Sequence, residues 1–300
     1  MRIGAMIGAD GANATLDDVI TVAKNVEAAG LDNVWLANIF GFDAISTLAL
    51  IGRETSKIGL GTAVTPTYPR HPTAIAQQAL TTAAASNNRF TLGIGLSHQI
   101  VIEGMLGMSY DKPAKHMREY LSVLMPLARG EQANFQGEHY RVQGLELSIP
   151  GAERMPVVVA ALGPVMLKIA AELADGTNTW MVGPKTMESH ILPSLHAGGN
   201  DDPTVVAGIP IVLTTRVDQA RESIANNLTI YGQLPSYRAM LDREGVAGPA
   251  DIAIVGDENS LRGEIKRFED MGVTDFNAAV MDVEDGAQAR TFEFLASLNG

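Results

Sequence analysis

Apolar runs and amphipathic stretches alternate along the whole chain. The apolar runs are rich in Val, Ile and Leu and lack regular polar alternation, a pattern typical of strands buried on both faces. The stretches between them carry apolar residues at helical spacing and begin at capping signals, such as Thr15 before two aspartates, or Pro72. The pattern predicts strands at residues 2–8, 33–37, 58–64, 90–96, 156–161, 177–182, 205–214 and 275–281, and helices at 15–30, 43–54, from 72, 113–129, 164–174, 185–195, 218–231, 258–271 and 285–298.

Eight strand–helix units in 300 residues predict an α/β protein, a closed (β/α)8 TIM barrel with residues 1–300 in a single domain. Two segments interrupt the rhythm and predict short insertions. One is a small hairpin over 134–142, after the fourth helix, and the other is an irregular, partly helical segment over 234–248, between the seventh and eighth strands. An open doubly wound sheet is the competing fold, but Gly8 and Gly11 match its glycine-rich turn only weakly.

The composition restricts the chemistry. The chain contains no cysteine, which excludes disulfides, thiolate catalysis, iron–sulfur clusters and cysteine-based zinc sites. With 22 Lys and Arg against 34 Asp and Glu, the net charge is −12, the wrong sign for a nucleic-acid or anionic-membrane partner. The first apolar stretch is too short for a secretory signal, and no stretch reaches the about 20 apolar residues of a spanning helix. We expect a cytoplasmic protein without a membrane partner.

Hydrolytic chemistry lacks its usual residues. None of the six histidines forms an H-x-H or H-E-x-x-H pair, and no predicted strand end combines His with closely spaced carboxylates, so we expect no metal site. No G-x-S-x-G elbow is present, since Ser97 lacks the flanking glycines, and no lysine ends a strand to form a Schiff base. These absences favour a site that takes its reactivity from a cofactor.

The loops after the third, fourth and fifth strands are neutral and built mostly from small residues. They read GTAVTPTYPRHP from Gly61, GIGLSH from Gly93 and AALGP from Ala160. Active sites of TIM barrels lie at this end of the strands. The Gly163–Pro164 pair places free backbone N–H groups at a helix start, which suits a phosphate, although taken alone the segment is more typical of an ordinary turn between strand and helix. Together the loops predict a shelf for a flat cofactor ring.

Three segments resemble the luciferase-like monooxygenase superfamily. IGLGTAVTPTYPRHP from Ile58 looks like its third-strand segment, and RFTLGIG from Arg89 looks like its fourth-strand signature. MPVVVAALGP from Met155, followed by ADG from Ala174, resembles the signature of the branch that uses the deazaflavin coenzyme F420. The match keeps its order and spacing over nearly the whole chain. The resemblance implies a (β/α)8 barrel, commonly a homodimer, that binds F420 or FMN with the ring in the barrel mouth.

The resemblance also assigns cofactor contacts to individual residues. It implies a non-prolyl cis peptide behind the ring at Ala63–Val64, and a hydroxyl against the cofactor at Thr65. The contact that follows the fourth strand matches Leu96, Ser97 and His98. The segment whose backbone binds the cofactor tail and phosphate matches Ala160, Ala161, Leu162 and Gly163.

Two positions depart from the sugar-phosphate dehydrogenases of this family. Their Asp-His after the second strand is Asn38-Ile39 here: Asn38 can hydrogen-bond a deazaflavin, but Ile39 cannot act as a base. Their glutamate after the fourth strand is replaced by His98, whose ordinary pKa near 6.5 suits proton exchange at neutral pH. Sugar-phosphate oxidation is therefore disfavoured, and reduction of an unsaturated substrate is favoured.

The sequence thus predicts an F420-dependent oxidoreductase that transfers a hydride between the deazaflavin C5 and a small organic substrate, through an activated C=C, C=N or C=O bond. His98 and Asn38 are the candidate catalytic residues, with two alternatives left open: His98 as a cofactor contact only, and Asn38 as a group that orients the ring. Phe40 and Trp180 are candidate walls of the substrate pocket, Trp180 being equally suited to barrel packing. An FMN-dependent monooxygenase fed by a separate reductase, and a non-catalytic flavin- or deazaflavin-binding protein, are the alternative functions.

Overall fold

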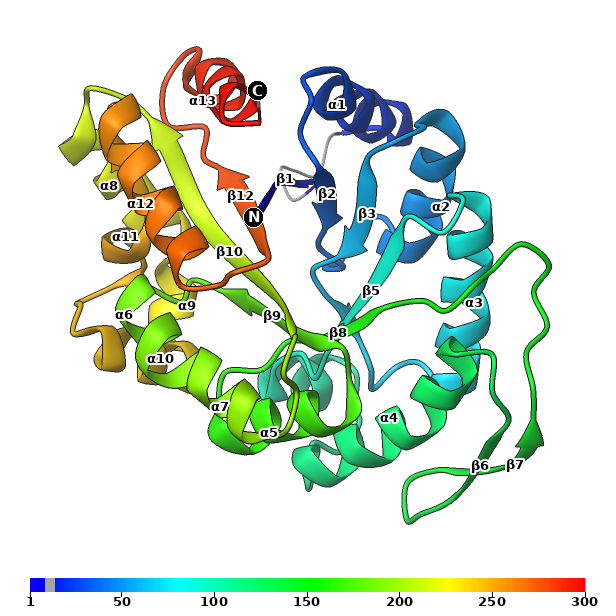
Figure 1. Ribbon diagram of the computed structural model, residues 1–300. Coiled ribbons are helices and arrows are strands. Elements are labelled where there is room, and N and C mark those ends of the chain that lie inside the picture. Colours follow the sequence, from blue (N-terminus) through cyan, green and yellow to red (C-terminus); the bar gives the residue numbers. More distant parts are fainter. Residues whose placement is uncertain (9–13, 300) are drawn as a thin grey trace.

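Eight parallel strands form a closed ring with helices outside it (Figure 1). The computed structural model describes residues 1–8 and 14–299, so most of the weakly matching turn from Gly8 to Asn13 lies outside the described residues. The strands closest in space to the N-terminal strand are β2 and β12, and pairs from Arg2–Asp275 to Ala5–Ala278 close the ring. The predicted TIM barrel is confirmed. Around the ring the strands are β1 (Arg2–Ile7), β2 (Asn33–Leu36), β3 (Gly59–Thr62), β5 (Phe90–Gly95), β8 (Val157–Val159), β9 (Gly176–Trp180), β10 (Thr204–Leu213) and β12 (Asp275–Val280).

The outer helices begin where the capping residues predict. Thr15 accepts a hydrogen bond from the Asp18 N–H, and the Asp18 carboxylate accepts one from the Thr15 N–H at 2.8 Å, a complete capping box. Pro72 opens its helix after His71. The helices are α1 (Leu16–Ala28), α2 (Ala44–Glu54), α3 (Pro72–Ala85), α4 (Pro113–Ala128), α5 (Pro164–Leu173), α8 (Val217–Asn227), α12 (Glu258–Asp270) and α13 (Ala287–Ser297).

Both predicted insertions are present. The first is the antiparallel hairpin of β6 (Ala133–Gln136) and β7 (Arg141–Leu145), whose turn is held on α4 because the Glu119 carboxylate accepts three backbone N–H groups from residues 138–140. The second insertion is mostly helical. It comprises α9 (Thr229–Gln233), α10 (Pro235–Glu244) and α11 (Pro249–Ile252), followed by the short strand β11 (Ile254–Gly256), which pairs with the end of β10.

Some element boundaries were predicted wrongly. The single helix expected at 185–195 is divided into α6 (Pro184–Thr186), the π-helix η2 (Met187–Ile191) and α7 (Leu192–Ala197), because Pro193 has no N–H with which to continue the hydrogen-bond ladder. The helix expected at 218–231 ends at Asn227, where Leu228 turns into the core. The π-helix η1 (Ile100–Met105) and β11 were not predicted.

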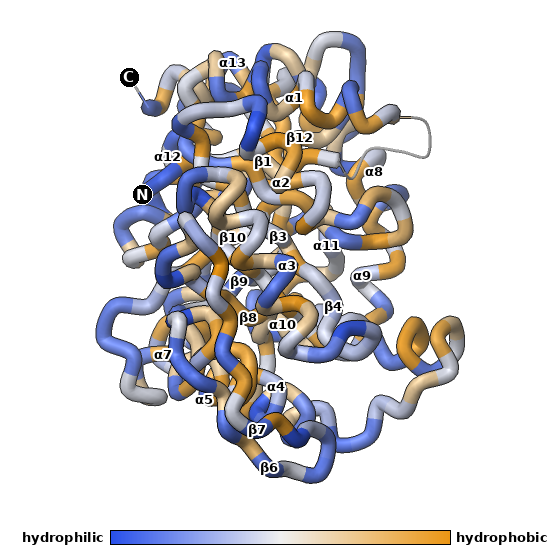
Figure 2. The backbone as a smooth tube through the Cα atoms, turned by 90° about the vertical axis from the view of Figure 1, so that its right-hand side faces the viewer, coloured by the Kyte–Doolittle hydropathy of each residue, from blue (hydrophilic) through white to orange (hydrophobic). Residues whose placement is uncertain are grey.

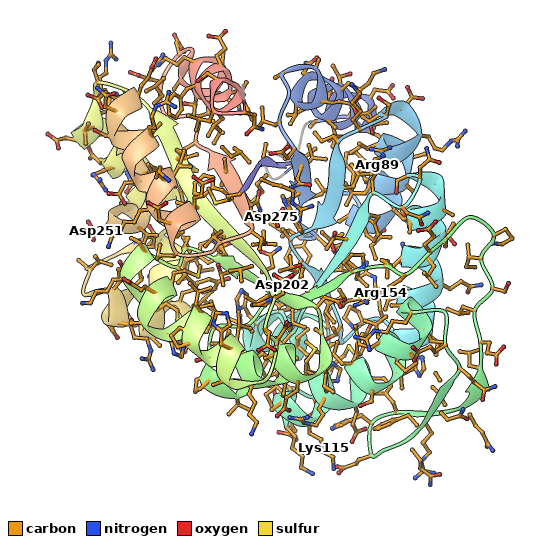
Figure 3. All side chains as sticks on the ribbon, in the orientation of Figure 1. Arg89, Lys115, Arg154, Asp202, Asp251 and Asp275 are labelled. Carbon is orange, nitrogen blue, oxygen red and sulfur yellow. The ribbon has the colours of Figure 1, made fainter. Side chains whose placement is uncertain are left out.

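Glycines make room for two tryptophans inside the barrel. Val34 and Leu36 pack outward against the helices, so the alternation along β2 turns Trp35 toward the interior. A Cβ on Gly61 would lie 2.3 Å from the Trp35 ring, and one on Gly208 would lie 3.0 Å from the Trp180 ring. Both positions therefore require glycine. Fully buried Asp275 lies within the ring of strands, where it accepts bonds from Arg2 and Asn33, each at 2.8 Å (Figure 3).

β3 carries one extra residue where it passes β5. Gly61 is opposite Thr91, and pairing resumes in β4 (Thr65–Pro66), where Thr65 is opposite Ile94. The bulge leaves the N–H and C=O of Gly93 without a backbone partner. The Thr62 hydroxyl replaces both bonds, because it donates to the Gly93 C=O at 2.7 Å and accepts from the Gly93 N–H at 2.9 Å.

The bulge predicts that Gly93→Ala is strongly destabilising. The added Cβ would lie 1.9 Å from the backbone oxygen of Thr62, so the backbone has to move. We expect the free energy of unfolding in urea to fall by about 3 kcal/mol. Gly263→Ala is the matched control, because a Cβ on this α12 residue meets nothing within 4 Å. It should leave stability unchanged or raise it by up to about 1 kcal/mol. Equal stability of the two variants would contradict the close approach of β3 and β5.

Candidate functional site

The structure brings most of the predicted site residues to one end of the barrel. Parallel strands end on the same side, and the pairs Thr65–Ile94, Ile94–Val159 and Val159–Thr177 place the ends of β4, β5, β8 and β9 next to one another. Asn38 and Phe40 follow β2, which pairs with β3 on the other side of the bulge. This end is called the barrel mouth below.

The bulge after β3 forms one part of the mouth. The Ala63–Val64 peptide is cis, as the resemblance implies. Val64 lies against β5, where a Cβ on Gly95 would approach Val64 Cγ2 to 2.7 Å and the Ala160 methyl to 3.2 Å. The bulge and the ends of β5 and β8 therefore contact one another through small residues. Thr65 is fully buried, and its hydroxyl has no hydrogen-bond partner among the residues that the structure describes.

Asn38 has one half of its amide already engaged. Its Oδ1 accepts a hydrogen bond from the backbone N–H of Ala44 at 3.0 Å, which fixes the loop after β2 to the start of α2. The side chain is half-buried. The amide nitrogen is therefore the group of Asn38 that remains to face a ligand, and it acts as a donor.

His98 lies in a partly dry environment at the end of β5. Burial lowers the pKa of its imidazole below the usual range, so the neutral ring dominates at neutral pH. Ser97 before it has a φ of 60°, in the left-handed region, and its carbonyl accepts a bond from the Tyr110 hydroxyl at 3.3 Å. This bond fixes the turn that presents His98 to the mouth.

Two tyrosines from the second insertion reach the mouth, and the sequence did not predict them as site residues. The Tyr237 ring lies 6.0 Å from the His98 ring and 5.1 Å from Tyr231, which in turn lies 6.2 Å from Trp180. His98, Tyr237, Tyr231 and Trp180 thus form a continuous aromatic wall between the ends of β5 and β9. Trp180 both packs inside the barrel and faces this wall.

The loop after β8 ends at an uncapped helix start. The Leu162 carbonyl lies 2.8 Å from Nε2 of the buried His190, which holds the loop in place. Gly163 is the N-cap of α5 and has no side chain to accept the first-turn N–H groups, and Leu167 is bonded back to the Gly163 carbonyl at 2.9 Å. The start of α5 therefore offers free N–H groups of positive potential to an anion.

A stack of three aromatic rings, in which His116 is buried and two tyrosines are half-buried, lies next to β4. The Tyr68 ring lies parallel to the His116 ring at 4.0 Å and stacks on Tyr110 at 5.2 Å. His116 Nε2 is 2.9 Å from the Thr67 hydroxyl, next to β4. Burial, reinforced by the nearby His139, lowers the pKa of His116 to about 4. The stack joins the loop after β4 to the segment that follows β5, and no sequence motif indicated it.

Comparison with known proteins agrees with this geometry. The model of the luciferase-like monooxygenase family matches residues 1–275. The chain belongs to the luciferase-like monooxygenase family. Within residues 1–8 and 14–299 of this family member, no group of three or more potential metal-ligating side chains gathers, and no helix is long and apolar enough to cross a membrane.

Relatives of this luciferase-like protein carry names that refer to F420 or methanopterin. A Mycobacterium tuberculosis protein, provisionally named a coenzyme F420-dependent oxidoreductase, is 34% identical over 189 residues, which cover 59% of this chain and 54% of the relative. The alignment thus spans about half of that relative's length. The 5,10-methylenetetrahydromethanopterin reductase of Methanolobus tindarius is 29% identical over 251 residues, 80% of this chain and 76% of the relative. The structure of the coenzyme F420-dependent tetrahydromethanopterin reductase from Methanopyrus kandleri shares the fold, with a TM-score of 0.81 over 98% of this chain and 97% of that chain, at 20% identity.

The depressed pKa of His116 predicts a specific loss of stability in acid. Because the folded pKa of about 4 lies below the unfolded value near 6.5, the unfolded chain binds the proton first as pH falls. Between pH 7 and pH 5 this group should lower the free energy of unfolding by about 2 kcal/mol. Urea unfolding of His116→Gln at both pH values should lack this contribution, whereas His196→Gln, at an exposed position on α7, should keep it. If the parent protein and both variants lose the same stability between pH 7 and pH 5, His116 is not buried in its neutral form.

Proposed function

We propose that this luciferase-like family member is an F420-dependent oxidoreductase that transfers a hydride between C5 of the deazaflavin and a small organic substrate, most simply by reducing an activated C=C, C=N or C=O bond. The observation that carries the proposal is the neutral cradle at the barrel mouth. Small residues of the bulge, β5 and β8 meet there beside the buried, unpartnered Thr65 hydroxyl and the uncapped start of α5. The relatives with F420 in their names support the choice of cofactor.

The residues of the cradle suit the parts of such a cofactor. When bound, F420 supplies or accepts a hydride at its ring. In the proposed arrangement the bulge of Ala63, Val64 and Thr65 supports the ring from behind, and the Asn38 amide nitrogen donates to a ring acceptor. Leu96 and Ser97 contact the ring from the end of β5. The backbone of Ala160, Ala161, Leu162 and Gly163, with the first N–H groups of α5, holds the tail and its phosphate.

His98 is proposed to exchange the proton that accompanies the hydride. Reduction of a double bond adds a hydride to one atom and a proton to the other. His98 stands at the mouth with a pKa below its usual range, so it can give up a proton readily and recover it from solvent. Phe40 and Trp180 are proposed to line the substrate pocket, where Trp180 is backed by Tyr231 at 6.2 Å. The aromatic wall excludes water from the reacting groups.

Two further properties are proposed. The family resemblance leads us to propose a homodimer, which sedimentation equilibrium of the purified chain tests directly, and the sequence pattern leads us to propose a cytoplasmic location. The alternatives to F420-dependent hydride transfer are an FMN-dependent monooxygenase and a non-catalytic binding protein. Tight FMN binding with oxygen consumption would favour the first alternative, and F420 binding without turnover of any activated alkene, imine or carbonyl compound would favour the second.

Cofactor binding should depend on the donor half of Asn38. We expect F420 to bind with quenching of its fluorescence. Asn38→Asp keeps the oxygen that accepts the Ala44 N–H at 3.0 Å but replaces the donor by a second oxygen. Because the variant should lose one hydrogen bond to the cofactor but keep its fold, we expect an F420 Kd about tenfold higher and an unchanged Tm. An unchanged Kd would place Asn38 outside the cofactor site.

Proton transfer by His98 should be visible in the pH profile. If the imidazolium donates the proton, kcat/KM rises as pH falls and levels off below the lowered pKa of His98. His98→Gln should lose this rise and reduce kcat by at least about 100-fold, while the F420 Kd changes by less than about threefold. Equal losses in turnover and in cofactor binding would identify His98 as a cofactor contact only.

A further inference from the structure

Exposed apolar side chains concentrate at the barrel mouth. The structure describes eleven large apolar residues that are exposed, and seven of them lie in the two segments that follow β2 and β5 and precede α2 and α4. Phe40 is 68% exposed and Ile100 is 70% exposed. Figure 2 shows an apolar stretch that projects from the body on the side that carries β4, α9 and α10. The apolar rim is defined here as the exposed residues of the loops after β2 and β5: Ile39, Phe40, Phe42, Ile100, Met105, Leu106 and Met108.

The rim continues into the aromatic wall. Ile100 opens η1 two residues after His98, whose ring neighbours Tyr237 at 6.0 Å. The exposed apolar segment after β5 therefore begins two residues from the residue proposed to exchange the proton. Solvent-exposed apolar residues that are scattered singly need no explanation, but a cluster around a ligand site indicates what the site binds.

Three cations at the mouth are paired with carboxylates. Arg70 lies 2.6 Å from the Asp43 carboxylate, Lys112 lies 3.0 Å from that of Glu138, and Arg216 lies 3.2 Å from that of Glu284. These three are the Lys and Arg residues in the described segments between the barrel strands and the α-helices that follow them. Lys185, on α6 after β9, lies 3.5 Å from the Glu244 carbonyl. A substrate carboxylate or phosphate would compete with a carboxylate for Arg70, Lys112 or Arg216, on a chain of net charge −12.

We infer that the substrate is an uncharged, predominantly apolar molecule, whose hydrocarbon part lies on the apolar rim while its reducible group faces His98. The position of the reducible group rests on the proposed function, whereas binding of the hydrocarbon part to the rim does not depend on it. We infer that a small molecule occupies the rim, because the rim adjoins the proposed active site. A second copy of the chain on the rim is the competing occupant, and the experiment distinguishes the two.

The first test measures binding without F420. Nile red, an uncharged apolar dye, should bind the full-length chain with increased fluorescence, and 1-decanol should displace it at a concentration at least about tenfold lower than decanoate. Phe40→Ser and Ile100→Ser should each weaken binding of the dye about fivefold. Val22→Ser is the control, because Val22 is also an exposed apolar residue, at 41%, but lies on the outer helix α1. It should leave binding unchanged.

The second test measures turnover along a homologous series of straight-chain enones with reduced F420. Each additional methylene should raise kcat/KM about three- to fourfold until the rim is covered. An enone of the same length that ends in a carboxylate should be at least about tenfold poorer. Phe40→Ser should flatten the dependence on chain length, and Val22→Ser should not.

The outcomes separate this inference from the proposed function. Dye binding that is indifferent to Phe40→Ser and Ile100→Ser, or equal displacement by decanoate, overturns the inference whatever the enzyme does. The inference is also overturned if the parent chain binds no dye and the molecular mass in solution halves in the rim variants. That result would assign the rim to a subunit interface. Rim-dependent dye binding supports the inference, and absence of F420 binding in the same sample contradicts only the proposed function.

Discussion

The architecture of the mouth depends on how β3 passes β5. One extra residue has to be accommodated between Gly61 and Thr65, and a buried backbone that loses two ladder bonds is costly unless another group replaces them. The Thr62 hydroxyl does so for Gly93, and it can approach because Gly93 has no side chain. Pairing with β5 resumes at Thr65, whose buried hydroxyl has no hydrogen-bond partner among the described residues. The proposed cofactor cradle is thus a consequence of closing the barrel at this point, because the same residues satisfy the sheet and shape the site.

The barrel interior ties the core to the site in a similar way. Trp35 and Trp180 fill space that glycines on the neighbouring strands leave, so aromatic rings pack inside the barrel beside the buried Asp275 and its partner Asn33. Trp180 also ends β9 at the mouth, where Tyr231 covers it. The packing predicted for this residue is present, since its ring lies against Gly208, and its place in the substrate pocket stays a proposal.

Local signals in the sequence were sufficient for most of the fold. The capping box at Thr15, the prolines at helix starts and the apolar strands each act over a few residues, so they could be recognised without tertiary information. The aromatic wall could not be predicted, because His98 and Tyr237 are far apart in the sequence and meet only when the second insertion folds over the mouth. The supporting role of His116 was missed for the same reason, since its partners Tyr68 and Thr67 come from the loop after β4. Residue type alone also left Asn38 undecided, and only its bond to the Ala44 N–H shows which half of the amide remains available.

The charges of the chain explain why recognition at this mouth has to rely on backbone and apolar groups. An acidic protein repels anions at long range, and the cations near the mouth are held by carboxylates, as Arg70 is by Asp43 at 2.6 Å. A phosphate can still bind at the start of α5, because uncapped N–H groups provide positive potential without a net charge that a neighbouring carboxylate could neutralise. The rest of the mouth is then left neutral and apolar, with a histidine whose burial keeps it uncharged until it takes up a proton. The proposed division, with the anionic part of a cofactor on the backbone and an apolar substrate on side chains, would allow two chemically different ligands to share one opening without competing for the same groups.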